Sequence, residues 1–155
     1  MGVSVLTIVR NRSAHLSQLV EGLRRSDHQP DELIIVDMSD DPVAFPSAQF
    51  HVHIDRFETN GLPLAAARNR AASLASHNKL VFLDVDCIPM RHCIGLLADT
   101  LSEHDSLLCA DIRYLGPDDA RGSWNEADLL GRGRAHPVRS FPQTGVREET
   151  NAGLF

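Results

Sequence analysis

Along the first part of the chain, short continuous runs of apolar residues alternate with segments in which apolar residues recur at helical spacing. Residues 3–9 form an almost unbroken apolar, β-branched run, which is typical of a strand buried on both faces. Apolar residues between positions 16 and 23 then recur at helical spacing behind Ser13, which predicts an amphipathic helix with a serine N-cap. A second short apolar run over 32–37 (ELIIVD) predicts another buried strand.

The alternation of strands and helices continues along the chain. Between residues 50 and 54, apolar side chains alternate with His51 and His53, which predicts a third strand with one face exposed. The two histidines share a face and could bind a metal, but a solvated strand face is the simpler interpretation. Pro63 fits the first position of an alanine-rich helix, and residues 79–84 (KLVFLD) predict a fourth strand.

Three further elements are expected beyond the fourth strand. Apolar spacing over 94–101 predicts a helix, residues 106–114 predict a fifth strand, and residues 123–130 predict a short helix whose Ser123 and Glu126 form a capping box. This order of strands and helices predicts an α/β fold with a mostly parallel sheet flanked by helices.

Composition and charge narrow the class of protein. With 155 residues, of which 43% are hydrophobic, the chain fits one globular domain with a single core. Its net charge of -6 argues against general binding to nucleic acids or anionic membranes. Three cysteines without a Cys-x-x-Cys pair indicate neither a disulfide framework nor a zinc site. With no transmembrane segment, we expect a soluble, cytoplasmic protein; the sequence gives no indication of its oligomeric state.

Polar residues follow three of the predicted strands. Arg10, Asn11 and Arg12 end the first strand, Asp37 ends the second, and Asp84 and Asp86 end the fourth. Ligands of parallel α/β sheets bind at the carboxyl ends of the strands. Two carboxylates separated by one residue suit Mg²⁺ or Mn²⁺ that also keeps water and phosphate oxygens as ligands. The alternative is that both acids only cap a turn before the following proline.

Three sequence blocks occur in the order known from one enzyme family. They are VSVLTIVRNR, ELIIVDMSDD and LAAARNRAASLASHNKLVFLDVDCIP, and in the last an Ala-Arg-Asn helix precedes the strand that ends in Asp-x-Asp. The chain resembles the N-terminal half of the family 2 glycosyltransferases, which are inverting enzymes of the GT-A fold. The resemblance implies that residues 1–115 form the nucleotide-sugar-binding half and that residues 116–155 begin an incomplete acceptor-side region.

The resemblance also implies roles for individual residues. The donor would be a nucleotide-diphosphate sugar, by default one of uridine, and the acceptor is not identified. Asp84 would hold the ribose, and Asp86 would hold Mn²⁺ or Mg²⁺. The complete set expected to bind the nucleotide sugar is Thr7, Arg10, Asn11, Asp37, Arg68 and Asp84. For Arg10, Arg12 and Arg68, a solvated arginine is the alternative interpretation.

The sequence departs from the family pattern in two places. Met38 stands where the family commonly has a second acid after the second strand. The acidic motif that supplies the catalytic base in the family does not follow the Asp-x-Asp block, and the adjacent acids Glu148 and Glu149 lie in an irregular, arginine-rich stretch. We therefore expect a fragment of a longer protein, and we assign no catalytic base.

Two other classes of protein stay open at this point. A haloacid-dehalogenase-type phosphatase also carries Asp-x-Asp after a buried strand, although its motif usually lies on the first strand and is followed by a lysine. The missing base also leaves a non-catalytic nucleotide-binding module as an alternative.

Overall fold

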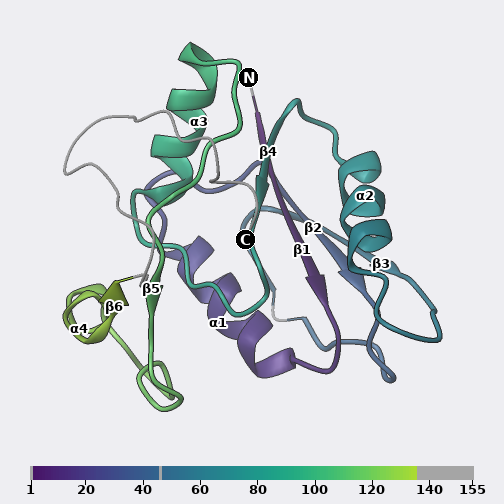
Figure 1. Ribbon diagram of the computed structural model, residues 1–155, viewed down its shortest axis with the longest axis horizontal. Coiled ribbons are helices and arrows are strands. Elements are labelled where there is room, and N and C mark those ends of the chain that lie inside the picture. Colours follow the sequence, from purple (N-terminus) through teal and green to yellow (C-terminus); the bar gives the residue numbers. More distant parts are fainter. Residues whose placement is uncertain (1, 46, 136–155) are drawn as a thin grey trace. The chain divides into compact units, whose positions relative to one another are not determined.

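The computed structural model describes residues 2–45 and 47–135 of the chain (Figure 1). It divides into two compact units, Met1–Glu103 and His104–Phe155. All of the residues expected to bind nucleotide sugar or metal lie in the first unit. Glu148 and Glu149 lie outside the described residues. The division of function at residue 115 stays a prediction.

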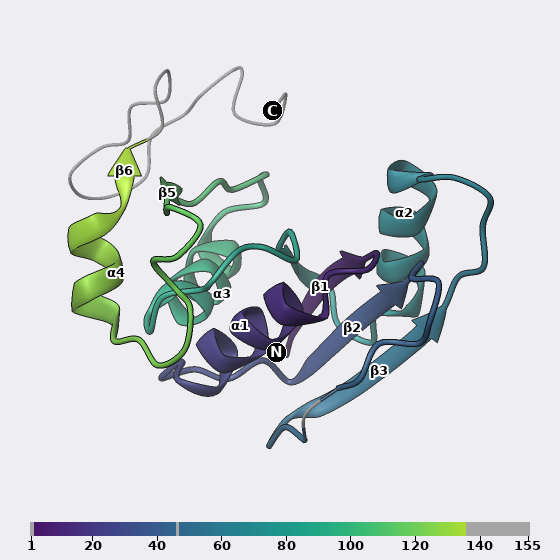
Figure 2. The same cartoon turned by 90° about the horizontal axis from the view of Figure 1, so that it is seen from below.

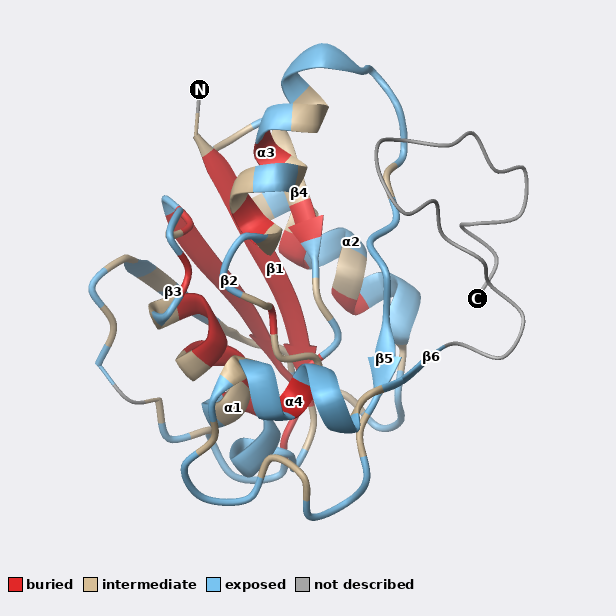
Figure 3. Ribbon diagram, turned by 90° about the vertical axis from the view of Figure 1, so that its left-hand side faces the viewer, coloured by how far each residue is buried: buried red, intermediate tan, exposed pale blue. Residues whose placement is uncertain are grey.

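A four-stranded parallel sheet forms the centre of the first unit. Its strands are β1 (Val3–Val9), β2 (Glu32–Asp37), β3 (His51–Arg56) and β4 (Lys79–Phe82), in the order β3-β2-β1-β4. Every pair of neighbours is parallel, and Figure 2 shows this for β1, β2 and β3. The predicted α/β fold with a mostly parallel sheet is confirmed. All residues of β1 and β2 are buried (Figure 3), as their continuous apolar runs predict.

Three helices cover the two faces of this sheet. Helices α1 (Ser13–Arg24) and α3 (Cys93–Glu103) pack on one face, where they share a core with the odd-numbered valines of β1. Helix α2 (Leu64–Leu74) packs on the other face, where its Ala67 and Ala71 contact the core around Leu6. No helix in the described part of the chain is long and apolar enough to span a membrane.

The ends of three elements differ from the sequence-based prediction. Arg12, not Ser13, is the N-cap of α1, and none of its side-chain atoms caps the helix. Pro63 is likewise the N-cap of α2 and not its first residue. β4 ends at Phe82, two residues earlier than predicted. The Leu83 amide still donates a hydrogen bond to the Leu6 carbonyl oxygen of β1, and the chain then turns away from the sheet. Asp84 therefore lies just beyond the strand.

The described residues of the second unit form smaller elements. β5 (Arg113–Tyr114) pairs antiparallel with β6 (Arg134–Ala135), and α4 (Glu126–Arg132) lies between them in the sequence. The strand predicted over 106–114 is therefore wrong except for its last two residues, since most of this segment is exposed and lacks strand pairing. A short apolar run alone does not make a strand without a neighbour to pair with.

The predicted capping box of the last helix is also wrong. The N-cap of α4 is Asn125, whose side chain accepts a hydrogen bond from the Asp128 amide at 2.9 Å. Asparagine is as good an N-cap as serine, so the helix begins two residues later than a Ser123 cap would place it.

A buried carboxylate ties the sheet together at the amino ends of its strands. Oε1 of Glu32 accepts hydrogen bonds from Ser4 Oγ and the Ser76 amide, both at 2.6 Å, and Oε2 accepts from Ser76 Oγ at 3.1 Å. Burial alone would raise the pKa of Glu32, but these hydrogen bonds outweigh burial and the pKa lies below its ordinary value. The network joins β1, β2 and the turn before β4.

The turn that carries the two aspartates is held against α1 by a close backbone approach. A Cβ atom built on Gly22 would lie 2.8 Å from Pro89 Cδ and 2.9 Å from the Pro89 carbonyl oxygen. Pro89 follows Asp86 by three residues, so the absence of a side chain at Gly22 sets how closely this segment packs.

We predict that Gly22→Ala destabilises the protein, although alanine is the better helix former by about 1 kcal/mol. The added methyl group must displace Pro89, and overpacking of this kind costs about 1–3 kcal/mol. Chemical denaturation would measure the free energy of unfolding. Ser17→Ala, at an exposed position of the same helix, is the control and should change it by less than about 0.5 kcal/mol. A Gly22→Ala variant more stable than the native chain would contradict the packing described here.

Candidate functional site

Strand register brings the predicted polar residues to one edge of the sheet. Val9 of β1 pairs with Asp37 of β2, and Leu6 of β1 pairs with Phe82 of β4. The segments that follow these strands therefore leave the sheet side by side at its carboxyl edge. This is the edge at which parallel α/β sheets bind ligands.

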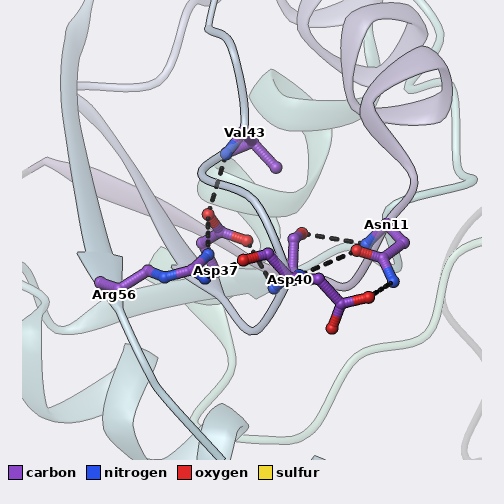
Figure 4. Close-up of polar contacts among 6 residues, drawn as sticks. Asn11, Asp37, Asp40, Val43 and Arg56 are labelled. Atoms are coloured by element: carbon purple, nitrogen blue, oxygen red, sulfur yellow. Dashed lines mark hydrogen bonds and ion pairs between the residues drawn. The ribbon is translucent and has the colours of Figure 1, made fainter.

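Asp37 is buried and fully engaged in hydrogen bonds. It is 1% exposed, and its carboxylate accepts from the Ser39 amide at 2.9 Å, the Val43 amide at 3.0 Å and Arg56 Nη1 at 2.9 Å (Figure 4). Burial alone would raise the pKa of Asp37, but the hydrogen bonds from Ser39, Val43 and Arg56 outweigh burial, and the pKa lies below its ordinary value. Asp37 thus fixes the turn after β2 as an anion.

Asn11 joins the loops that follow β1 and β2. Its amide nitrogen Nδ2 donates to Asp40 Oδ2 at 2.8 Å, its Oδ1 accepts from the Asp40 amide at 3.0 Å, and its backbone amide donates to Ser39 Oγ at 2.9 Å (Figure 4). Its φ of 54° lies in the left-handed region, which asparagine tolerates better than most residues. Asn11 therefore has a structural role at this edge, whatever else it contacts.

Arg10 is directed toward the loop between β3 and α2. Its guanidinium donates to the Gly61 carbonyl oxygen and lies 3.9 Å from Asp40 Oδ1. Gly61 has a φ of 142°, a value that side chains rarely allow, so glycine permits the loop conformation that Arg10 contacts. Arg10 connects the first strand end to the loop that leads into α2.

The two acids of the Asp-x-Asp sequence each pair with an arginine. Arg68 Nη2 lies 2.9 Å from Asp84 Oδ1, and Arg12 Nη1 lies 3.1 Å from Asp86 Oδ2. The side chains of Asp84 and Asp86 are 65% and 52% exposed, so both carboxylates remain open to solvent and to ligands. Each of these two carboxylates at the carboxyl edge therefore has a guanidinium group beside it.

Thr7 contributes to the lining of the same small cavity as Arg68 and Asp84, although its side chain is buried. It is 2% exposed, and alternation along β1 places its side chain on the face of Val5 and Val9, opposite the α2 face. Among the described residues, nothing within hydrogen-bonding distance pairs with its buried hydroxyl group. The nucleoside contact expected at Thr7 stays a prediction.

Among the described residues, the carboxyl edge of the sheet carries a small cavity. This cavity of about 10 Å³ lies between β1, β4 and α2, and this volume holds about one water molecule. Its lining brings together three of the predicted site residues, Thr7, Arg68 and Asp84, with apolar side chains of β1, β4 and α2.

The donor set fits a divalent cation only in company with other oxygen ligands. Within residues 2–45 and 47–135, no group of three or more acidic, histidine or cysteine side chains could hold a metal ion. Mg²⁺ is commonly bound through one or two carboxylates together with phosphate oxygens and water, and Asp84 and Asp86 can supply that number. The neighbouring Cys87 is unsuited as a ligand, because burial and the charges of Asp86 and Asp84 raise its pKa to about 11.

Three contributors to the site escaped the sequence analysis. Ser39 and Asp40 lie in the turn after β2, and an Asp-x-Ser sequence that can form an Asx turn was the available signal. Arg56 reaches Asp37 only because β3 pairs with β2 in a register that aligns these two residues. No local pattern around Arg56 indicates this contact.

Comparisons with known proteins place these features in a family. The sequence profile described as "Glycosyl transferase family 2" matches residues 4–155. Among solved structures, S. aureus TarS 1-349 matches with a TM-score of 0.54 at 23% identity, and its complex with UDP-GlcNAc with a TM-score of 0.56 at 23% identity. These matches cover 67% of this chain and 33% and 32% of the TarS chains, so the chain spans about a third of their length. The likeness shows the fold. A search of curated proteins finds no match.

We predict that Asp37→Asn lowers the free energy of unfolding by about 2–3 kcal/mol at neutral pH, since hydrogen bonds to a buried carboxylate are lost or reversed. Because the folded-state pKa of Asp37 lies below its ordinary value, its stabilisation is complete above about pH 4 and is lost as the pH falls through the folded-state pKa. Denaturation of both chains at neutral and acidic pH would measure the difference. It should shrink in acid, and a difference independent of pH would contradict the role of the charge. Asp41→Asn, in the same turn but exposed, is the control.

Proposed function

This chain belongs to glycosyl transferase family 2, and we propose that the carboxyl edge of its sheet binds a nucleotide-diphosphate sugar as donor for sugar transfer. The observation that carries the proposal is the pairing of Asp84 and Asp86 with Arg68 and Arg12 at that edge. The carboxylates suit a cation and ribose hydroxyl groups, and the guanidinium groups suit phosphate oxygens. The family match favours this function over a phosphatase.

Each charged residue has a proposed role in donor binding. Asp84 accepts hydrogen bonds from the ribose, Asp86 holds Mn²⁺ or Mg²⁺, and Arg68 contacts the diphosphate. When bound, the cation supplies Lewis-acid stabilisation of the diphosphate as it leaves. Arg68 already lies against Asp84, so one movement of its side chain would bring the guanidinium to a phosphate beside the ribose.

The nucleoside is proposed to lie over the turns that follow β1 and β2. TarS has been solved with UDP and with UDP-GlcNAc, which supports uridine as the base in this chain as well. Because the carboxylate of Asp37 is taken up by Ser39, Val43 and Arg56, its proposed contribution is to shape this turn. Arg10 and Asn11 would hold the adjoining loops in place around the nucleoside.

The transfer reaction itself is proposed for the whole protein. In an inverting reaction the acceptor hydroxyl attacks the anomeric carbon in line while a carboxylate removes its proton, which contributes about 10²–10⁴-fold to the rate. We assign neither this carboxylate nor the acceptor among the described residues. The donor-binding step can be tested on this chain alone.

We predict that UDP binds the chain only in the presence of a divalent cation, because Asp86 and the diphosphate each supply part of the cation's ligands. Calorimetric titration with UDP, GDP and TDP, with Mn²⁺ and after chelation, would measure both the metal dependence and the base preference. We expect UDP to bind most tightly with Mn²⁺. Equal affinity after chelation would disprove the role of the metal, and equal affinity for the three nucleotides would disprove the preference for uridine.

We further predict that the two aspartates differ in their effects. Asp86→Asn should weaken UDP binding in Mn²⁺ by more than about tenfold and should remove its metal dependence, since a charge-assisted contact is lost. Asp84→Asn should weaken binding about tenfold and leave the metal dependence in place. The same titrations with both variants measure this. Asp99→Asn, at an exposed position of α3, is the control for loss of a negative charge. Indistinguishable profiles for the two site variants would rule out separate roles.

A further inference from the structure

The ion pair between Arg12 and Asp86 places a cationic side chain on the carboxylate assigned to the metal. Arg12 Nη1 lies 3.1 Å from Asp86 Oδ2, and the two residues are 74 positions apart in the sequence. We propose that Arg12 competes with the divalent cation for Asp86, and that donor binding transfers the Arg12 guanidinium from Asp86 to the diphosphate. This inference rests on the function proposed above for the same site.

The backbone of Arg12 is held in place, whereas its side chain is half exposed. The preceding residue, Asn11, is fixed by three hydrogen bonds to Ser39 and Asp40, and Arg12 itself is the N-cap of α1. The side chain of Arg12 is 52% exposed and forms an ion pair with Asp86. A guanidinium on a fixed backbone and a flexible stem can exchange one anionic partner for another nearby.

The local electrostatics favour an anion beside Arg12. The first turn of α1 carries no acidic residue. The side chain of its N-cap residue, Arg12, accepts no hydrogen bond from the backbone amides of the helix. The positive end of the helix dipole is therefore left uncompensated next to Arg12. Asp86 pairs with the Arg12 guanidinium in the structure, and a diphosphate brought in by a donor can meet both this guanidinium and the helix dipole.

The strength of the Arg12–Asp86 pair suits an exchange. Ion pairs between exposed side chains change an equilibrium by a factor of about five or less, so a cation chelated by Asp86 and a diphosphate can displace Arg12. The exchange also conserves charge, because the diphosphate of a nucleotide sugar is a dianion and arrives with a divalent cation. Asp86 gains the cation, and Arg12 gains an oxyanion to which its planar group can donate two hydrogen bonds.

The ion pair between Arg56 and Asp37 differs from the Arg12–Asp86 pair in how far its carboxylate is buried. Asp37 is 1% exposed and accepts three hydrogen bonds, one of them from Arg56, so its carboxylate is buried and fully engaged. Both partners of the Arg12–Asp86 pair are half exposed. Two arginine–aspartate pairs at one sheet edge therefore serve different purposes, one holding the turn and the other exchanging with ligand.

The test measures Mn²⁺ binding and UDP binding separately in the 155-residue chain. Free Mn²⁺ is followed by electron paramagnetic resonance without nucleotide, and UDP affinity is then measured by calorimetry in saturating Mn²⁺. Arg12→Gln should bind Mn²⁺ about fivefold more tightly than the native chain and UDP about fivefold more weakly. Arg12→Lys, which keeps the charge but not the planar group, should bind Mn²⁺ like the native chain and UDP with intermediate affinity.

Arg25→Gln is the matched control. It removes the same charge from the opposite end of α1, about 20 Å along the helix at 1.5 Å per residue, where Arg25 pairs with Glu21. Both affinities should stay at their native values. Circular dichroism of each variant would verify that the fold is kept.

The outcomes separate the two proposals. Opposite shifts of Mn²⁺ and UDP affinity in Arg12→Gln support the exchange, and Mn²⁺ uptake by this variant when the native chain takes up none supports its competition step. If the native chain binds UDP with Mn²⁺ but Arg12→Gln alters neither affinity, the exchange is wrong and the donor site stands. If Mn²⁺ binds more tightly to Arg12→Gln but no chain binds UDP, the competition stands while the transfer to diphosphate and the proposed function are wrong. Uptake of Mn²⁺ by neither chain overturns the exchange.

Discussion

The burial of β1 on both faces is the constraint on which the rest of the structure depends. Its seven residues are all buried, and it pairs along one edge with β2 and along the other with β4. A parallel strand in this position must satisfy its backbone groups on both sides, so its neighbours are held in one register. That register determines which residues meet where the strands end, and the polar loops gather there as a result.

The carboxylates at this edge differ in how far they are buried, and this difference determines what each of them can bind. Asp37 is enclosed and meets three donors, so its charge stabilises the turn and is unavailable for exchange. Asp84 and Asp86 are more than half exposed, and each has an arginine partner that solvent and ligands can reach. In water, such contacts are weak and reversible, which is the property that a site for a charged ligand needs.

Much of the fold and the position of the site could be predicted from the sequence. The continuous apolar runs of β1 and β2 identified buried parallel strands, and the Asp-x-Asp sequence after β4 identified the edge where the acids lie. Long-range pairing could not be predicted. Arg12 meets Asp86, and Arg56 meets Asp37, only through strand register and loop paths that no local pattern encodes. The predictions of the helix N-caps failed for a different reason, since several neighbouring polar residues can each serve as N-cap.

The Glu32 network lies at the amino edge of the sheet, at the other end of the strands from Asp84 and Asp86. The polar groups of this network are thus separated along the strands from the charged residues of the carboxyl edge, because Ser4 and Ser76 contact Glu32 at the amino edge. A substitution that alters the stability of the sheet at Glu32 can therefore leave the acidic and basic side chains of the other edge unchanged.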